Sequence, residues 1–127
     1  MNDKELAEKV AEKLGWSKGK HGNQVWFKPC GYLGNVPTQT PVMTGAYPEL
    51  EDVIFKDWNT FGLMIEKADE MGWRLYSGTC IDIYEPVFWF VRYWNNGESA
   101  TETSPHSTKK HGHIKACALA FVELPND

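Results

Sequence analysis

The sequence contains few cysteines and no long apolar run, and each shortage excludes a class of protein. Its three cysteines, Cys30, Cys80 and Cys117, are an odd number without a close pair. That pattern excludes a disulfide framework and a CxxC metal knuckle, and it predicts a reducing compartment. No apolar run is long enough to span a bilayer, and the mixed charge of the first residues is unlike a signal peptide. We therefore expect a cytoplasmic protein without a membrane partner.

An excess of positive charge is also missing. The formal net charge is −4, from 13 Lys and Arg against 17 Asp and Glu, so the electrostatic footprint of a general nucleic-acid binder is absent. The chain has neither a G-x-G-x-x-G nor a Walker A pattern, which argues against a Rossmann or P-loop phosphate site. We expect no extended nucleic acid as a partner, although a local basic patch is compatible with this charge.

What the sequence does contain is an ordinary globular composition with many aromatic residues. A length of 127 residues predicts a single domain, residues 1–127. Six Trp, six Phe and five Tyr provide more flat, rigid surface than a core of this size needs, and Trp and Tyr are favoured at binding surfaces. Some of these side chains are expected to face a ligand or a second subunit, and we predict a homo-oligomer.

Three segments have the apolar periodicity of an amphipathic helix. The first covers residues 3–14, where apolar residues recur at three- and four-residue spacing before Gly15. The second is expected to begin after an N-cap at Asp57 and to end at Gly72. The third starts near residue 114. The apolar stripes expected on the second and third helices are Trp58, Phe61, Ile65 and Ala68, and Ile114, Cys117, Ala118 and Phe121.

Extended segments are expected between these helices. Residues 24–28 are expected to form a short strand or an extended segment, and the Gly- and Pro-rich residues 30–50 a long loop. Residues 73–77 and 80–84 are predicted to be two strands around a turn at Gly78.

The most apolar strand is expected at residues 87–94, where Val, Phe, Trp and Tyr follow one another almost without interruption. Residues 95–97, Asn-Asn-Gly, are a hairpin signal, so residues 100–103 should pair back antiparallel. A polar loop is expected at residues 104–113. The predicted class is α+β, with an antiparallel sheet flanked by N-terminal, central and C-terminal helices.

Four segments of the chain resemble the phage ABA-sandwich domain family of small phage and prophage proteins. These are "AEKLGW", "VWFKP", "DWNTFGLMIEKADEMGW" and "IKACALAFVEL". The match departs at "HSTKKHGH", before the last helix. The resemblance implies a sheet between helices, an α/β/α-type sandwich, and a phage origin, but no reaction. Some phage proteins of similar plan, such as the Thoeris anti-defence sponges, bind nucleotide signals of bacterial immunity, which is an analogy of fold.

Two groups of residues supply the chemistry of nucleotide binding. A base stacks on an aromatic ring, an amide reads its edge, and Arg or Lys neutralises phosphate near a helix N-terminus. The alternative is that Phe90 lies in the core, that the charged side chains are only solvated, and that the two asparagines form only a turn. The candidate ligand-binding residues are Phe90, Arg92, Trp94, Asn95, Asn96, Lys109, Lys110 and Lys115.

Catalytic and metal sites are not indicated. His106, His111, His113 and Cys117 lack the spacing of a closed zinc site, and Cys117 falls on an apolar stripe. No family signature supports a Cys–His nucleophile. Four acids that could form an acid–base pair have the more common role of solvated surface residues: Asp69, Glu70, Asp82 and Glu85.

The expectation is therefore a protein that is not an enzyme and has no catalytic residue, metal or cofactor. We expect it to sequester a small phosphorylated, cyclic nucleotide signal of anti-phage immunity in the host cytosol. The alternatives are a phage accessory protein that binds a host protein through an aromatic-rich surface, and a small hydrolase.

Overall fold

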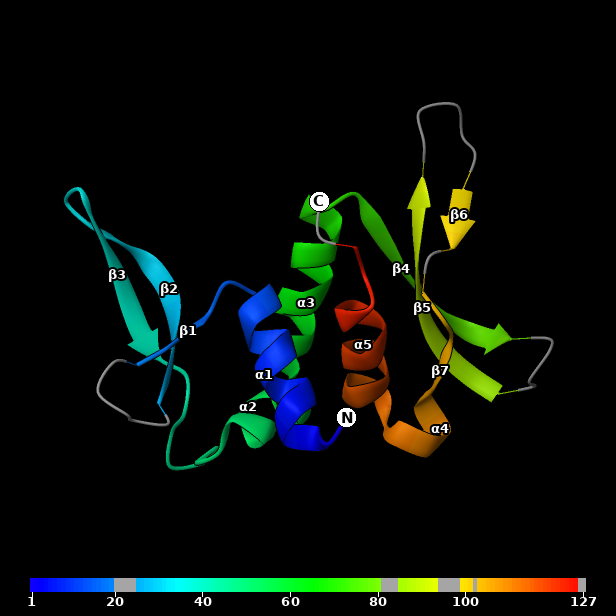
Figure 1. Ribbon diagram of the computed structural model, residues 1–127, viewed down its shortest axis with the longest axis horizontal. Helices are drawn as coiled ribbons and strands as arrows, with labels where there is room; N and C mark the ends of the chain where they lie inside the picture. The colour runs from blue at the N-terminus through cyan, green and yellow to red at the C-terminus, as the bar shows by residue number, and fades with distance from the viewer. Residues whose placement is uncertain (20–24, 81–84, 94–98, 102, 126–127) are drawn as a thin grey trace. The chain divides into compact units, whose positions relative to one another are not determined.

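The computed structural model describes residues 1–19, 25–80, 85–93, 99–101 and 103–125, and it forms two compact units, Met1–Asp57 and Trp58–Asp127 (Figure 1). Each unit combines helices with an antiparallel sheet. The predicted α+β class is therefore confirmed. The single domain and the sandwich of one sheet between helices stay predictions.

The helices of the first unit are α1 (Asp3–Lys13) and α2 (Leu50–Lys56), which pack against each other. The Asn2 side chain caps α1 by accepting a hydrogen bond from the Glu5 backbone N–H at 2.8 Å. This helix buries Leu6, Ala7, Val10 and Ala11, as its periodicity predicts. The sequence analysis missed α2, because a helix of two turns at the end of a Gly- and Pro-rich segment has too little periodicity to detect.

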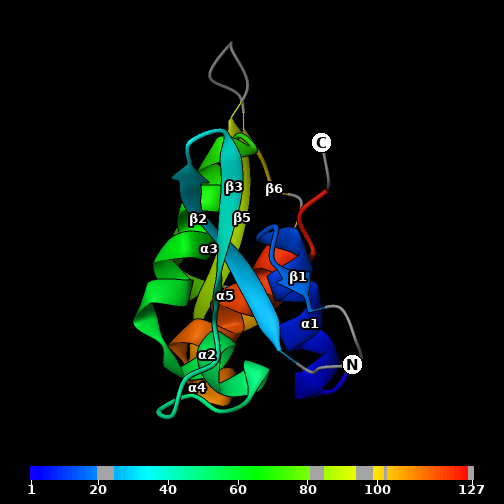
Figure 2. The same ribbon diagram turned by 90° about the vertical axis from the view of Figure 1, so that its left-hand side faces the viewer.

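The first sheet comprises β1 (Ser17–Lys18), β2 (Trp26–Leu33) and β3 (Val36–Pro41), in that order. The expected loop over residues 30–50 is therefore wrong for residues 30–33 and 36–41, which form the hairpin that faces the viewer in Figure 2. The prolines misled the prediction: β3 pairs only with β2 among the described strands, and an edge strand tolerates proline.

The helices of the second unit are α3 (Trp58–Glu70), α4 (Thr108–His111) and α5 (His113–Val122). α3 begins directly after Asp57 and ends before Gly72, as predicted, and the role of Asp57 as its N-cap stays a prediction. The predicted apolar stripe is correct only at Ala68. The fully buried row is Thr60, Met64 and Ala68, whereas Trp58 is 60% exposed. Apolar residues flank this row, so periodicity alone could not identify the centre of the buried face. The stripe predicted for α5 is confirmed, since Ile114, Cys117, Ala118 and Phe121 are all buried.

The second sheet contains β4 (Trp73–Cys80), β5 (Glu85–Tyr93) and β6 (Ser99–Thr101), and β7 (His106–Ser107) also pairs with β5. The turn predicted at Gly78 is wrong, because β4 continues through Gly78, which pairs with Val87. The second strand predicted there covers residues 80–84. Residue 80 is the last residue of β4, and residues 81–84 lie outside the described part.

The remaining expectations for this sheet are partly confirmed. The predicted strand at residues 87–94 is confirmed as far as Tyr93, and β6 pairs back with β5 as expected. The hairpin turn at residues 95–97 lies outside the description. The polar loop expected at residues 104–113 is wrong where β7 and α4 form.

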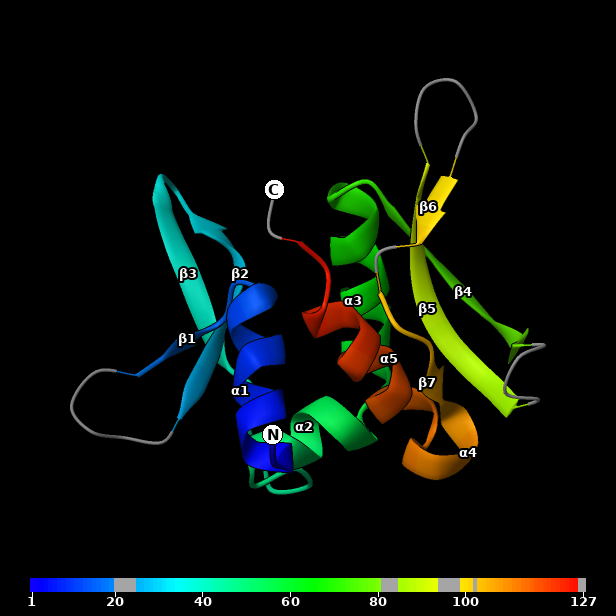
Figure 3. The same cartoon turned by 45° about the vertical axis from the view of Figure 1, so that its right-hand side comes forward.

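Helices α3 and α5 lie side by side on one face of the second sheet (Figures 1 and 3). Trp73 and Phe88 are 1% exposed, and the Phe88 ring lies against the α3 residue Phe61. Side chains alternate along a strand, so Tyr76 and Trp89 lie on the opposite face. Their rings stack at a centroid distance of 6.0 Å.

Candidate functional site

The segment that leads into α5 is basic, although the chain as a whole is acidic. Residues 103–122 contain three lysines and three histidines but no Asp or Glu, in a chain of net charge −4. Lys109 and Lys110 are exposed on α4, and Lys115 is half-buried on the first turns of α5. Such a concentration of positive charge attracts an anionic ligand.

An aromatic cluster lies at the start of α5. The His113 ring contacts three others: it meets Phe88 edge to face at a centroid distance of 4.2 Å, Phe61 at 5.5 Å and Trp58 at 5.8 Å. Phe88 is buried, Phe61 is half-buried and Trp58 is exposed. The cluster therefore runs from the core to the surface and ends in an indole ring that is accessible from solvent.

Gly112 separates α4 from α5, and both Gly112 and His113, the first residue of α5, are exposed. Gly112 has φ 83°, a conformation that residues other than glycine rarely adopt. Because Gly112 has no side chain, none can accept a hydrogen bond from the first turn of α5 at the N-cap position. The helix has ten residues, and its partial positive charge at this end favours an anion.

Hydrogen bonds fix α4 beside the start of β5. The Thr108 hydroxyl donates to the Pro86 carbonyl at 3.1 Å, and the Ser107 hydroxyl caps α4 by accepting from the Lys110 N–H at 3.1 Å. The two exposed lysines of α4 are thus carried on a helix whose first turn is anchored to the sheet.

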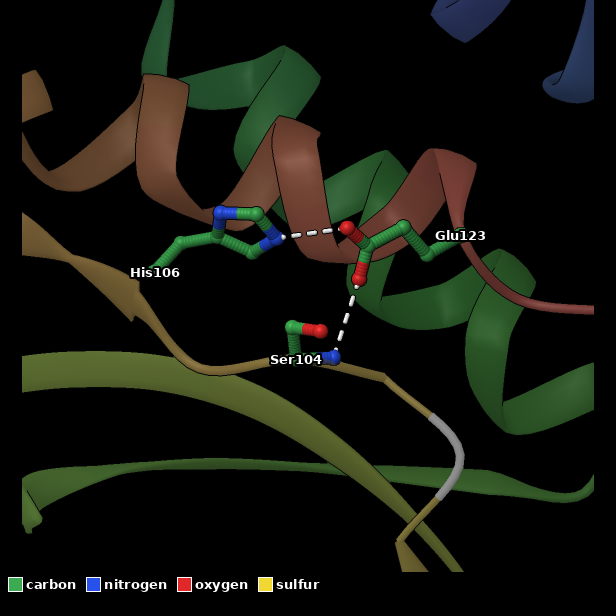
Figure 4. Close-up of polar contacts among 3 residues, drawn as sticks. All are labelled: Ser104, His106 and Glu123. Carbon is green, nitrogen blue, oxygen red and sulfur yellow. Dashed lines mark hydrogen bonds and ion pairs between the residues drawn. The ribbon is translucent and has the colours of Figure 1, made fainter.

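Glu123, the first acidic residue after the basic segment, lies at the C-terminal end of α5. The Glu123 carboxylate pairs with the His106 imidazole at 2.9 Å and accepts a hydrogen bond from the Ser104 N–H at 3.0 Å (Figure 4). His106 is therefore engaged in holding β7 against α5, and it does not contribute to the aromatic cluster.

The structure places the predicted ligand-binding residues in two separate groups. The backbone of Arg92, in β5, lies opposite Trp73 of β4. Helix α4 lies beside Pro86, which precedes Arg92 by six residues and is about 20 Å from it along β5. The backbone of Phe90 lies opposite Leu75, but the side chains of Phe90 and Arg92 are outside the description. So are Trp94, Asn95 and Asn96.

The histidines and cysteine considered as metal ligands lie in different surroundings. His106 pairs with Glu123, His113 packs on Phe88, and Cys117 is buried. Burial raises the pKa of Cys117 to about 12, so its thiol keeps its proton at neutral pH. Across the described ranges, no three His, Cys, Asp or Glu residues are grouped as a metal site would require.

Sequence reasoning missed Trp58, Phe61 and Phe88 as site residues, because it assigned the first two to a buried helix stripe. The signal that could have identified them is the position of Trp58 at the first residue of α3, where a helix has few neighbours to cover a large ring.

Comparison of the chain with protein-family models, curated proteins and solved structures found no match. None of the described helices combines the length and the apolar character needed to cross a membrane.

Proposed function

We propose that the protein binds and sequesters a small phosphorylated, cyclic nucleotide at the start of α5, as a non-catalytic phage protein in the host cytosol. The observation that carries this proposal is the exposed Trp58 ring, which packs against His113 at a helix start without a side-chain cap. The family resemblance supports the phage origin and suggests the sandwich arrangement. Homo-oligomerisation is part of the same proposal.

The three elements of the site match three parts of a nucleotide. The outer face of Trp58 offers a surface on which a base can stack, a contact worth about 1–3 kcal/mol. The first turn of α5 provides a favourable dipole for phosphate, and Lys109 and Lys110 provide mobile positive charge. Such a site binds its ligand by shape and charge, and sequestration requires no bond to be broken.

The residues near the end of β5, Phe90, Arg92, Trp94, Asn95 and Asn96, remain part of the proposal as a second contact region. Arg92 and α4 lie at opposite ends of β5, so the two groups form separate contact regions on one subunit. Each group therefore has to be tested by itself.

Isothermal titration with 3′,5′-cyclic AMP, cyclic dinucleotides and cyclic ADP-ribose isomers tests the proposal. Trp58→Ala should weaken binding roughly five- to a hundredfold, and the double variant Lys109→Ala, Lys110→Ala should reduce its salt dependence. The matched controls are Tyr32→Ala, another exposed aromatic residue, and Lys4→Ala with Lys9→Ala on α1. Equal affinities in all four proteins would place the site elsewhere.

Mass spectrometry of the ligand released by heat separates binding from turnover. A sequestering protein returns the nucleotide intact, whereas the hydrolase alternative predicts an altered mass. If no nucleotide binds the wild-type protein, the proposal fails.

One observation favours the alternative function of binding a host protein. Residues 29–48 contain no charged residue, and the tip of the β2–β3 hairpin exposes Tyr32, Leu33 and Val36 by 64–78%. Apolar side chains gathered at an exposed tip are typical of a protein-binding surface. A pull-down from host lysate with the wild type and with Tyr32→Ser, Leu33→Ser, Val36→Thr tests this, since only the wild type should retain the partner.

A further inference from the structure

A groove lies between the C-terminal half of α3 and the start of β4, which are joined by a short connection (Figure 1). Its volume is about 410 Å³, within the range of small-molecule binding sites. The α3 residues that line it follow Trp58 by seven to eleven positions, or roughly 10–17 Å along the helix. The groove is therefore separate from the nucleotide site proposed above. The lining residues are Ile65, Glu66, Asp69, Trp73, Arg74 and Leu75.

The base of the groove is apolar. Trp73 is 1% exposed, and Ile65 and Leu75 are half-buried. Because side chains alternate along a strand, Trp73 and Leu75 lie on the same face of β4. An apolar group bound on these three side chains would be removed from water, which favours binding in proportion to the area buried.

Charged side chains of both signs line the same groove. Glu66 and Asp69 are three residues apart on α3, so they lie on one side of the helix, and Arg74 comes from β4. All three are exposed. In the described part of the chain, none of these three side chains forms an ion pair or a hydrogen bond. The arginine and the acids are thus farther apart than the distance of an ion pair, about 4 Å.

We propose that this groove binds a free α-amino acid with an apolar side chain. The ammonium group of such a ligand pairs with Glu66 and Asp69, and its carboxylate pairs with Arg74, whose guanidinium suits a carboxylate. The apolar side chain of the ligand then lies on the base of the groove. A ligand of one charge pairs with only one wall. A volume near the lower end of the range for ligand sites favours a single amino acid over a peptide.

Isothermal titration of the wild-type protein with amino acids and their derivatives tests the proposal. L-leucine and L-phenylalanine should bind, and glycine, which has no side chain to bury, should bind roughly tenfold more weakly or worse. N-acetylleucine lacks the ammonium group and leucinamide lacks the carboxylate. Each should bind about five- to thirtyfold more weakly than leucine. These comparisons need no variant, so they test the proposal even if a substitution impairs folding.

Variants of the charged residues assign each wall of the groove to one end of the ligand. Arg74→Gln should weaken leucine binding about five- to thirtyfold and leave leucinamide binding unchanged. The double variant Glu66→Gln, Asp69→Asn should weaken both ligands and leave N-acetylleucine unchanged. Glu70→Gln is the matched control, because Glu70 pairs with Lys67 and does not line the groove. No binding of any amino acid by the wild type at millimolar concentration, or leucine affinities that the three groove substitutions leave unchanged, would overturn the proposal.

Discussion

The imidazole of His106 and the carboxylate of Glu123 lie 2.9 Å apart, and this pair connects β7 to the end of α5. The same carboxylate accepts the Ser104 N–H, so one side chain holds two points of the segment between β6 and α4. Because Glu123 has two partners, Ser104 and His106, we expect its side chain to stabilise the second unit.

Replacing Glu123 with alanine should lower the free energy of unfolding by about 0.5–1.5 kcal/mol, because both hydrogen bonds are lost and the site is only partly exposed. Urea unfolding measures this change. Glu70→Ala is the matched control: Glu70 pairs with Lys67 at 3.7 Å and its side chain is 70% exposed, so its loss should change stability by a few tenths of a kcal/mol. Equal effects would show that the Glu123 contacts contribute nothing specific.

Cys117 should make stability depend on pH in the alkaline range. Its pKa is raised to about 12 by burial, whereas an unfolded thiol titrates near 8.5. The folded state thus keeps a proton that the unfolded chain has lost, and the free energy of unfolding falls as pH rises from about 8.5 towards 12.

The slope from this group is at most about 1.4 kcal/mol per pH unit. Unfolding in urea at pH 8 and at pH 10, with Cys117→Ala as the reference, isolates it from the titration of lysine and tyrosine. The wild type should lose more stability than the variant between these two pH values. Parallel losses would contradict the burial of the thiol in the folded state.

Two glycines of the α3 region should respond in opposite directions to the same substitution. Gly62 lies inside α3, and a methyl group there would meet nothing within 4 Å beyond its chain neighbours and the backbone of its own helix, so Gly62→Ala should stabilise by about 0.5–1 kcal/mol. Gly72 ends the helix with φ 86°, so Gly72→Ala should destabilise by about 1–2 kcal/mol. Thermal unfolding of both variants checks the sign, and a stabilising Gly72→Ala would be inconsistent with this helix end.

The buried face of α3 can be located by a pair of large-to-small substitutions. Met64 is 0% exposed, and Met64→Ala should cost about 2–5 kcal/mol. Trp58 is 60% exposed, and Trp58→Ala should cost less than about 1 kcal/mol while it weakens nucleotide binding. Urea unfolding and titration calorimetry on the same samples separate the two roles. A larger loss of stability at Trp58 would restore the stripe predicted from the sequence.

The elements that the sequence predicts well are those in which one local signal dominates. α1 and α5 have apolar residues on one face, and β5 has a run of β-formers from Val87 to Tyr93. Each of these signals lies within the element itself. These elements can therefore be predicted from local sequence alone, without reference to the elements that pack against them.

The elements that it predicts poorly depend on distant partners. β3 contains two prolines and is a strand only because β2 lies beside it on one side. Gly78 continues β4 because Val87 pairs with it and the Trp89 ring lies over it, 3.8 Å from where a Cβ would stand. In the site, the lysines near α5 were identified from charge, but the contact of Trp58 with His113 joins residues 55 positions apart.

The unequal edges of the two sheets have a consequence for assembly size. β3 contains two prolines, β2 beyond Phe27 contains Lys28, Pro29 and a register shift, and β6 and β7 have only three and two residues. Among the described strands, β4 is therefore the one long edge strand without a proline or a lysine. A protein with one such edge exhausts it when two copies pair. Strand addition at one such edge would therefore stop at a closed pair of chains instead of continuing into a fibre.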